Sequence, residues 1–166
     1  MAVSILLFIS KAVQAQPDTA RINQRILFYT DSLVKADHYL NWSAYADLAP
    51  ASVVKYYGGK EGFIGHVQVL RARTSSIMEE NPPVSQVLQL SSKNEQWQCV
   101  VRQSSYFHKE DKQYHFTTYL IGQSIDDGQT WRLFDTSYTP VANLILIFPD
   151  IFGDLALEQP TIAVFK

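Results

Sequence analysis

The segment Ser124–Trp131 reads S-x-D-x-G-x-T-W and constrains the fold of this chain more than any other stretch. It lies between two runs of β-forming residues, Tyr114–Ser124 and Trp131–Tyr138. Asp-Gly at the centre of such a pair is a strong hairpin signal, because glycine tolerates a positive φ. The segment therefore predicts a tight turn between two antiparallel strands.

The same segment resembles the Asp box of sialidase-type propeller repeats. Propellers carry such motifs blade after blade, whereas this chain contains the motif once and has no internal repeat. We therefore interpret it as the turn that joins the last two strands of another β-structure. In that role Asp126 caps the loop, Gly128 supplies the backbone conformation and Trp131 anchors the final strand.

Hydrophobic periodicity predicts helices in the first half of the chain. Asp18 can cap a helix from about Thr19 to Ala36. Its apolar face consists of the following residues, spaced three and four apart: Ile22, Ile26, Tyr29, Leu33 and Ala36. A short helix over about Leu40–Leu48, a brief strand over Val53–Tyr57 and a long helix over about Lys60–Met78 are expected next.

After Pro83 the period changes from 3.6 to 2, which predicts an antiparallel meander. Val84–Ser92 is expected to place Val84, Leu88 and Leu90 on one side. Gln96–Phe107 is expected to place Trp97, Cys99 and Val101 on one face. The region 139–166 is predicted to hold a short helix, Val141–Phe148, and an irregular tail with enough apolar residues to pack down.

The order of helix, short helix, short strand, helix and curved meander resembles the nuclear transport factor 2-like superfamily. The passages Tyr45–Pro50 and Val53–Glu61 resemble its strand, Gly-Gly, helix passage, and Trp131–Asp135 resembles its final strand. The resemblance covers residues 18–138. It implies an α+β cone, or half-barrel, whose N-terminal helices pack in the concave face of a curved antiparallel β-sheet around a pocket.

The N-terminus resembles a secretory signal peptide over residues 1–15. An apolar run, Ala2–Ile9, precedes Val13-Gln14-Ala15, which has small residues where a signal peptidase requires them. This predicts export to the periplasm or the outside of the cell, with no integral membrane segment in the mature chain, because the run is too short to span a bilayer. The alternative is an ordinary N-terminal helix and a cytoplasmic protein.

Charge and residue spacing exclude several classes of partner and cofactor. The net charge is -2 and no basic run exceeds two residues, so nucleic acid is not expected as a partner. The four histidines show no metal-ligand spacing, so we predict neither a metal nor another cofactor.

A cone pocket would take side chains from the first helix and from the strands. Tyr29 is the polar tip on an apolar helical face, and its alternative role is that of an ordinary core tyrosine. Asp135 is in phase with Trp131 and Leu133, so it faces inward if they do, and loss of hydration would raise its pKa. Its alternative role is that of a strand-end Asp near the cone mouth, solvated or paired with Arg102 or Arg132. The predicted ligand-binding set is Tyr29, Trp42, Tyr45, Tyr56, Tyr119 and Asp135.

Three functions are compatible with these features. The first is binding of a small apolar or aromatic ligand without catalysis. The second is a small lyase, isomerase or hydrolase that uses Tyr29 and Asp135. Ketosteroid isomerase-like proteins place an oxyanion-binding Tyr where Tyr29 stands, but Tyr56 occupies the position of their catalytic Asp and cannot act as that base near neutrality.

The third function is a dimerising interaction domain. In a homodimer formed through the sheet, the contact surface would be the outer face of the meander. Part of that face would consist of Gln98, Val100, Arg102 and Ser104. Such a mixed face fits a polar interface and plain solvent exposure about equally.

Overall fold

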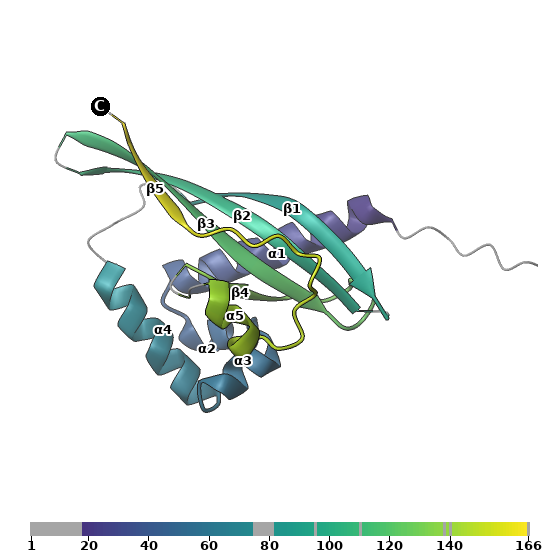
Figure 1. The fold of residues 1–166 in the computed structure, drawn as a ribbon. Coiled ribbons are helices and arrows are strands. Elements are labelled where there is room, and N and C mark those ends of the chain that lie inside the picture. The colour runs from purple at the N-terminus through teal and green to yellow at the C-terminus, as the bar shows by residue number, and fades with distance from the viewer. Residues whose placement is uncertain are drawn as a thin grey trace, which may run out of the picture.

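The computed structural model describes residues 18–74, 82–94, 96–109, 111–137, 139 and 141–165. The protein has an α+β fold in which N-terminal helices precede a curved, five-stranded antiparallel sheet that does not close into a barrel (Figure 1). The predicted fold class is confirmed. The helices are α1 (Thr19–His38), α2 (Trp42–Asp47), α3 (Ala51–Tyr56), α4 (Lys60–Thr74) and α5 (Val141–Ile147). The strands are β1 (Val84–Lys93), β2 (Gln96–Lys109), β3 (Lys112–Ser124), β4 (Arg132–Asp135) and β5 (Thr161–Phe165).

Helix α1 forms as its sequence pattern predicts. The Asp18 carboxylate accepts a hydrogen bond from the Arg21 backbone N–H at 3.1 Å, which caps the helix. The buried face consists of Ile22, Ile26, Thr30, Leu33 and Ala36. Thr30 takes the central place expected of Tyr29, which is only partly buried.

The strand predicted over Val53–Tyr57 is wrong, because this segment forms the helix α3. Pro50 precedes it with φ -58°, and its carbonyl accepts a hydrogen bond from the Val54 N–H at 3.1 Å. The helical turn buries Val53 in a cluster that includes Phe63 of α4. Burial thus overrides the β-propensity of the two adjacent valines, which is a weak and context-dependent preference.

The sheet has the strand order β1-β2-β3-β4, and β5 pairs with β3 as well. Its inner face, which packs against α1, carries Trp97, Cys99 and Val101 as predicted. The predicted side for Val84, Leu88 and Leu90 is wrong. A register shift between Val87 and Gln89 turns Val87 and Leu90 toward the core, while Val84 is 71% and Leu88 37% exposed.

The loop between β3 and β4 has the predicted turn structure. Asp126 accepts hydrogen bonds from the Ser124 hydroxyl at 2.8 Å and from the Thr130 N–H at 2.9 Å. Gly128 has φ +77°, and a Cβ there would lie 3.1 Å from Ile22 of α1. Trp131 is buried, and its indole N–H donates to the Gly128 carbonyl at 3.1 Å.

The C-terminal segment crosses the outer face of the sheet, the face away from α1 (Figure 1). The Gln98 side chain donates to the Asp150 carbonyl at 2.6 Å and accepts from the Phe152 N–H at 2.8 Å. Ile151, Phe152, Leu155 and Leu157 pack there as predicted.

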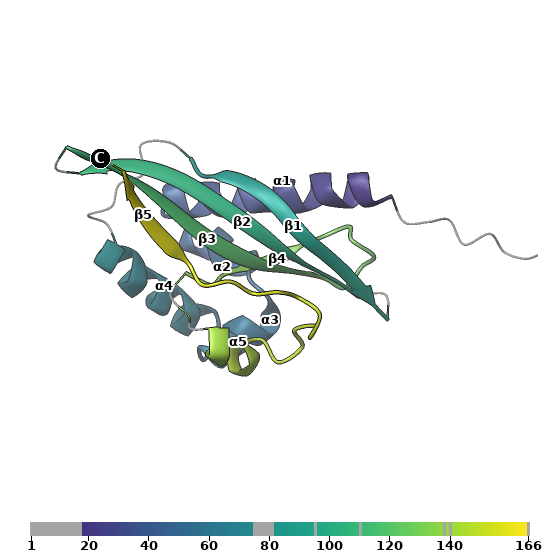
Figure 2. The ribbon, with the colours of Figure 1, turned by 45° about the horizontal axis from the view of Figure 1, so that its top comes forward.

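The last residues of the tail differ from the prediction of irregular, packed structure. Residues Thr161–Phe165 form β5 on the edge of β3 (Figure 2). The reason is that β4 covers only residues Leu120–Gln123 of β3, so the rest of that edge can accept a β-forming segment.

The predicted signal peptide and residues Met78, Asn81 and Tyr138 lie outside the described residues. Within the described part of the chain, no helix is both long and apolar enough to cross a bilayer.

Candidate functional site

A cavity of about 120 Å³ lies between the C-terminal half of α1, helix α4 and the inner face of β2 and β3. It is therefore the space enclosed between the helices and the concave side of the sheet. The lining residues are Leu33, Val34, Asp37, Tyr45, Phe63, His66, Val67, Leu70, Arg71, Pro83, Gln103, Ser105, Phe116, Thr118, Leu120, Phe134, Asp135, Ser137 and Thr139.

One wall of the cavity is apolar. Phe63, Val67 and Leu70 are spaced three and four apart along α4, so they share one helical face. Leu33 of α1 extends this wall. A ligand that displaces water from these groups would gain hydrophobic free energy.

The opposite wall comes from the sheet, where buried polar side chains stand beside Phe116, Leu120 and Phe134. Gln103 and Ser105 continue the inward alternation of β2 beyond Val101, and both are buried. Thr118 lies opposite Gln103 on β3 and is also buried. The Gln103 amide donates to the Ser85 hydroxyl at 3.3 Å, which fixes its orientation.

Asp135 projects into the cavity from the end of β4. Trp131 and Leu133 are both buried in the core, and Asp135 pairs with the inward-facing Leu120. The predicted phase of Asp135 is therefore confirmed. Its Oδ1 accepts a hydrogen bond from the Ser137 N–H at 2.8 Å and another from the Ser137 hydroxyl, which hold the carboxylate in one orientation.

An ion pair stands where the cavity meets the surface. Arg71 of α4 lies 3.6 Å from Asp37 of α1, and both side chains are about one third exposed. Partial burial raises the pKa of Asp37, and the nearby Arg71 and His38 oppose this rise. The pair therefore adds one charge of each sign at the mouth of the cavity.

His66 is held against the cavity by an aromatic neighbour. Its imidazole stacks on Tyr57 with ring centroids 4.1 Å apart. Burial raises the pKa of Tyr57, although a hydrogen bond with Thr139 opposes the shift. The stack fixes the imidazole on α4, the helix that also supplies the apolar wall.

Two of the predicted ligand-binding residues line the cavity, Tyr45 and Asp135. Tyr45 is stacked on Phe63 with centroids 6.2 Å apart, and Trp42 contacts the edge of Tyr45 from outside the lining. Tyr29 packs against the core cluster beneath α1 and is not among the lining residues. The helix instead presents Leu33 and Asp37 to the cavity, because they lie one and two turns further along.

The structure does not bring Tyr56 and Tyr119 to the cavity. Tyr56 is 54% exposed at the end of α3. Tyr119 lies on the outer face with Val100 and Leu155, and its hydroxyl donates to the Glu158 carboxylate at 2.5 Å. Its neighbours Thr118 and Leu120 face inward, so the alternation of β3 turns Tyr119 away.

The sequence pattern contained signals for several cavity residues that were not predicted. Continuing the period of two from Val101 leads to Gln103 and Ser105. Continuing the helical spacing from Leu33 leads to Asp37. Arg71 and His66 flank the predicted stripe of α4, and only the packing of α4 beside α1 shows that they reach the same space.

The described residues do not indicate a metal-binding site or a reactive cysteine. No group of three or more His, Cys, Asp or Glu side chains there could hold a metal ion. Cys99 is fully buried, and burial raises the pKa of its thiol. A buried thiol with a raised pKa is a poor nucleophile, so Cys99 is a core residue.

Comparison with known proteins does not extend this description. A scan against protein-family models, a search of curated proteins and a search of solved structures each find no match to this chain. The nuclear transport factor 2-like resemblance therefore stays a prediction, and the case for a function rests on the cavity.

Proposed function

We propose that the protein binds a small apolar or aromatic ligand in the cavity between α1, α4 and the sheet, without catalysing a reaction. The observation that carries this proposal is the cavity itself, about 120 Å³ in volume, with an apolar stripe on α4 and buried polar groups on the sheet. An engineered apolar cavity of about 150 Å³ binds benzene. The volume therefore suits a ligand of about one ring, and typical drug-sized pockets are larger, at roughly 300 Å³ or more.

The two walls favour a ligand with one apolar side and one polar group. Val67 and Leu70 would contact the ring, and Gln103, Thr118 and Asp135 would meet the polar group. Directional hydrogen bonds on one wall orient a ligand that hydrophobic contact alone would leave free to rotate. Membership of the nuclear transport factor 2-like superfamily is part of this proposal, supported by the order of helices and curved antiparallel meander.

Catalysis is the second candidate and has less support. Asp135 lines the cavity, as a small lyase, isomerase or hydrolase would require. Tyr29, its proposed partner, is partly buried against the core cluster and does not line the cavity. An acid or base has to lie within hydrogen-bond reach of the reacting group, so a pair divided between core and cavity does not favour this function.

In a homodimer through the outer face of the sheet, only part of the proposed contact surface would be accessible. Gln98 and Val100 are buried beneath the C-terminal segment of the same chain. Arg102 remains exposed, and its guanidinium donates to Gln86 on the neighbouring strand at 2.5 Å. Such a dimer would need the outer surface beyond the covered region.

The ligand-binding proposal can be tested with single-ring compounds. Toluene, phenol, benzylamine and benzoate would be titrated into the full chain, with binding followed by ligand-observed NMR and thermal unfolding. We expect at least one compound to bind and to raise the unfolding temperature, because a ligand of the folded state stabilises it.

A matched pair of variants locates the binding. Val67→Trp fills the cavity from α4 and is expected to abolish the NMR signal of binding. Val69→Trp on the same helix is exposed and is expected to leave binding unchanged. Binding that survives Val67→Trp, or a complete absence of binding to the unaltered chain at millimolar concentration, would contradict the proposal.

A further inference from the structure

Strand β5 presents an open sheet edge. It pairs with β3 over the register Thr161↔Thr117 to Phe165↔Gln113. Among the strands that the structure describes, no other strand pairs with β5, and all five of its residues are exposed. Its second edge therefore offers a row of backbone N–H and C=O groups to another strand.

Strand β5 is short and directly follows Pro160, but its own five residues lack several features by which sheet edges avoid association. Natural edges carry charged side chains, proline or bulges. Residues 161–165 include no charged residue and no proline, and Ile162, Val164 and Phe165 are 54%, 52% and 47% exposed. The opposite edge, β1, does carry an irregularity between Val87 and Gln89. The two edges of the sheet thus differ in their readiness to pair.

We propose that β5 pairs in antiparallel orientation with β5 of a second copy of this chain, which joins two sheets across a twofold axis. A register centred on Ala163 pairs all five residues. It places Ile162 opposite the partner's Val164, where two exposed apolar side chains cover each other. The two Ala163 side chains lie opposite each other at the twofold axis, where larger side chains would be least tolerated.

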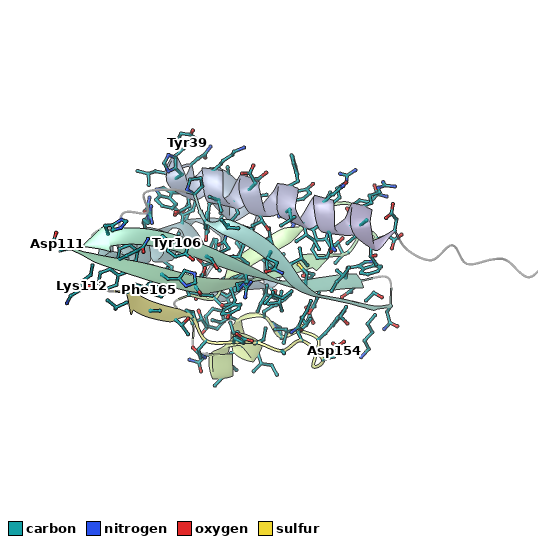
Figure 3. All side chains as sticks on the ribbon, turned by 90° about the horizontal axis from the view of Figure 1, so that it is seen from above. Tyr39, Tyr106, Asp111, Lys112, Asp154 and Phe165 are labelled. Carbon is teal, nitrogen blue, oxygen red and sulfur yellow. The ribbon has the colours of Figure 1, made fainter. Side chains whose placement is uncertain are left out.

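The charges at the two ends of β5 favour this orientation. Glu158 precedes the strand, and Lys112 lies beside its C-terminal end, because Phe165 pairs with Gln113. Figure 3 shows Lys112 and Phe165 at the same end of the sheet. An antiparallel pair brings each Glu158 toward the other copy's Asp111 and Lys112, whose charges cancel. A parallel pair would instead bring the two Glu158 carboxylates together.

This interface differs from a dimer through the outer face, because backbone pairing at an edge leaves both faces of the sheet uncovered. Pairing of a five-residue strand buries less surface than the roughly 1,200 Å² typical of stable complexes. We therefore expect a weak dimer whose population rises with protein concentration. A second copy is the occupant that presents an identical, equally uncharged strand.

A disulfide experiment tests both the pairing and its register. The chain has one cysteine, Cys99, which is buried. An Ala163→Cys variant of the full chain, without a C-terminal tag, would therefore have a single accessible thiol. Directly opposite residues of an antiparallel pair have Cα atoms about 4.5–5.5 Å apart, within disulfide range. Mild oxidation is expected to give a covalent dimer on a non-reducing gel.

Val84→Cys is the matched control, because Val84 is an exposed residue on the opposite edge strand. It is expected to remain largely monomeric under the same oxidation. Equal cross-linking of both variants would show random collision and overturn the proposal, and stronger cross-linking of Ile162→Cys than of Ala163→Cys would overturn the register.

Sedimentation velocity provides an independent measurement on the unaltered chain. Its weight-average mass is expected to rise with concentration, and Val164→Lys is expected to remove that rise by placing a charge on the edge. A far-UV circular dichroism spectrum checks that the variant is folded. An unaltered chain that remains monomeric at every concentration would contradict the proposal.

Discussion

Strands β2 and β3 run the length of the sheet, but their two ends are packed very differently. Near the β3–β4 loop, α1 covers the inner face and the C-terminal segment covers the outer face. Cys99 and Val100, adjacent residues of β2 that point to opposite faces, are both almost completely buried there. Near the other end, Tyr106 on β2 is 47% exposed, and the inner face lines a cavity.

The difference shows that the boundary between core and cavity coincides with a change of side chains along the inner face of β2. The inner face of β2 reads Trp97, Cys99 and Val101 and then changes to Gln103 and Ser105. Large apolar side chains fill the space beneath α1, whereas Gln103 and Ser105 line the cavity. Stability is therefore expected to depend on the core end, and ligand binding on the cavity end.

The largest effect is expected from Trp131→Ala at the core end. Removing this fully buried indole leaves a void and frees the Gly128 carbonyl, so the free energy of unfolding should fall by about 3–5 kcal/mol. Urea denaturation measures the loss. Ile125→Ala, an exposed residue of the same loop, should change it by less than about 0.5 kcal/mol. A loss below about 1 kcal/mol for Trp131→Ala would contradict the role of this end as the main core.

Gln98→Leu tests the covered outer face. The substitution leaves the Asp150 carbonyl and the Phe152 N–H without their partners, so we expect a loss of about 2 kcal/mol in the free energy of unfolding. Faster hydrogen exchange of Phe152 should accompany it. Arg102→Leu, four residues along the same face but exposed, should cost less than about 0.5 kcal/mol. Equal losses for the two variants would mean that the C-terminal segment adds no stability.

Gly122→Ala tests the packing density at the core end. A Cβ at this position would lie 2.5 Å from the Cys99 Sγ and 3.0 Å from the Leu133 Cδ2, so we expect a loss of about 1–3 kcal/mol. Cys99→Ala removes the closest atom. The double variant should therefore lose less than the two single variants together, which a double-mutant cycle measures. If the losses of the two single variants are additive, the strain in Gly122→Ala does not come from contact with Cys99.

Asp37→Asn is expected to have the smallest effect and concerns the mouth of the cavity. Because burial raises the pKa of Asp37, the ionised carboxylate is less favourable in the folded state than in the unfolded state. Stability from this group is present below the ordinary Asp pKa, about 3.9, and is lost as the pH rises through the folded-state pKa.

The Asp37→Asn variant should therefore gain up to about 1 kcal/mol relative to the unaltered protein at pH 7, and nothing at pH 3. Urea denaturation at both pH values measures the difference. Asp31→Asn on the same helix, where the exposed Asp31 pairs with Lys35 at 2.7 Å, should show no gain at pH 7. A gain at pH 3 that equals the gain at pH 7 would exclude the titration of Asp37 as its cause.

The sequence predicted the structure correctly where a local residue pattern directs one face of a helix or strand to the core. The apolar stripe of α1, the alternation of β2 through Val101 and the turn at Asp126 all formed as expected. It failed at α3, where two valines indicated a strand but burial against Phe63 favoured a helix. It failed again at Leu90, because the register shift between Val87 and Gln89 reverses the side-chain direction of the residues that follow.

The candidate site was predictable only in part for the same reason. Asp135 was placed correctly, because a turn and a short strand determine its phase over a few residues. Tyr119 was not, because the alternation that turns Leu120 inward turns Tyr119 to the outer face, where the C-terminal segment covers it. Tyr45 and Asp135 come from elements far apart in the chain, and their shared cavity depends on how α2 and β4 pack.

The sequence by itself determined helix α1, the long antiparallel strands β2 and β3, the inward phase of Asp135 and the tight turn at Asp126–Gly128. These are consequences of steric and hydrogen-bonding preferences that act over a few residues. Only the tertiary structure decided that Gln103, Asp37 and His66 share one cavity and that β5 lies open on the edge of β3. Such arrangements depend on the packing of segments distant in the sequence, and local preferences carry no information about that packing.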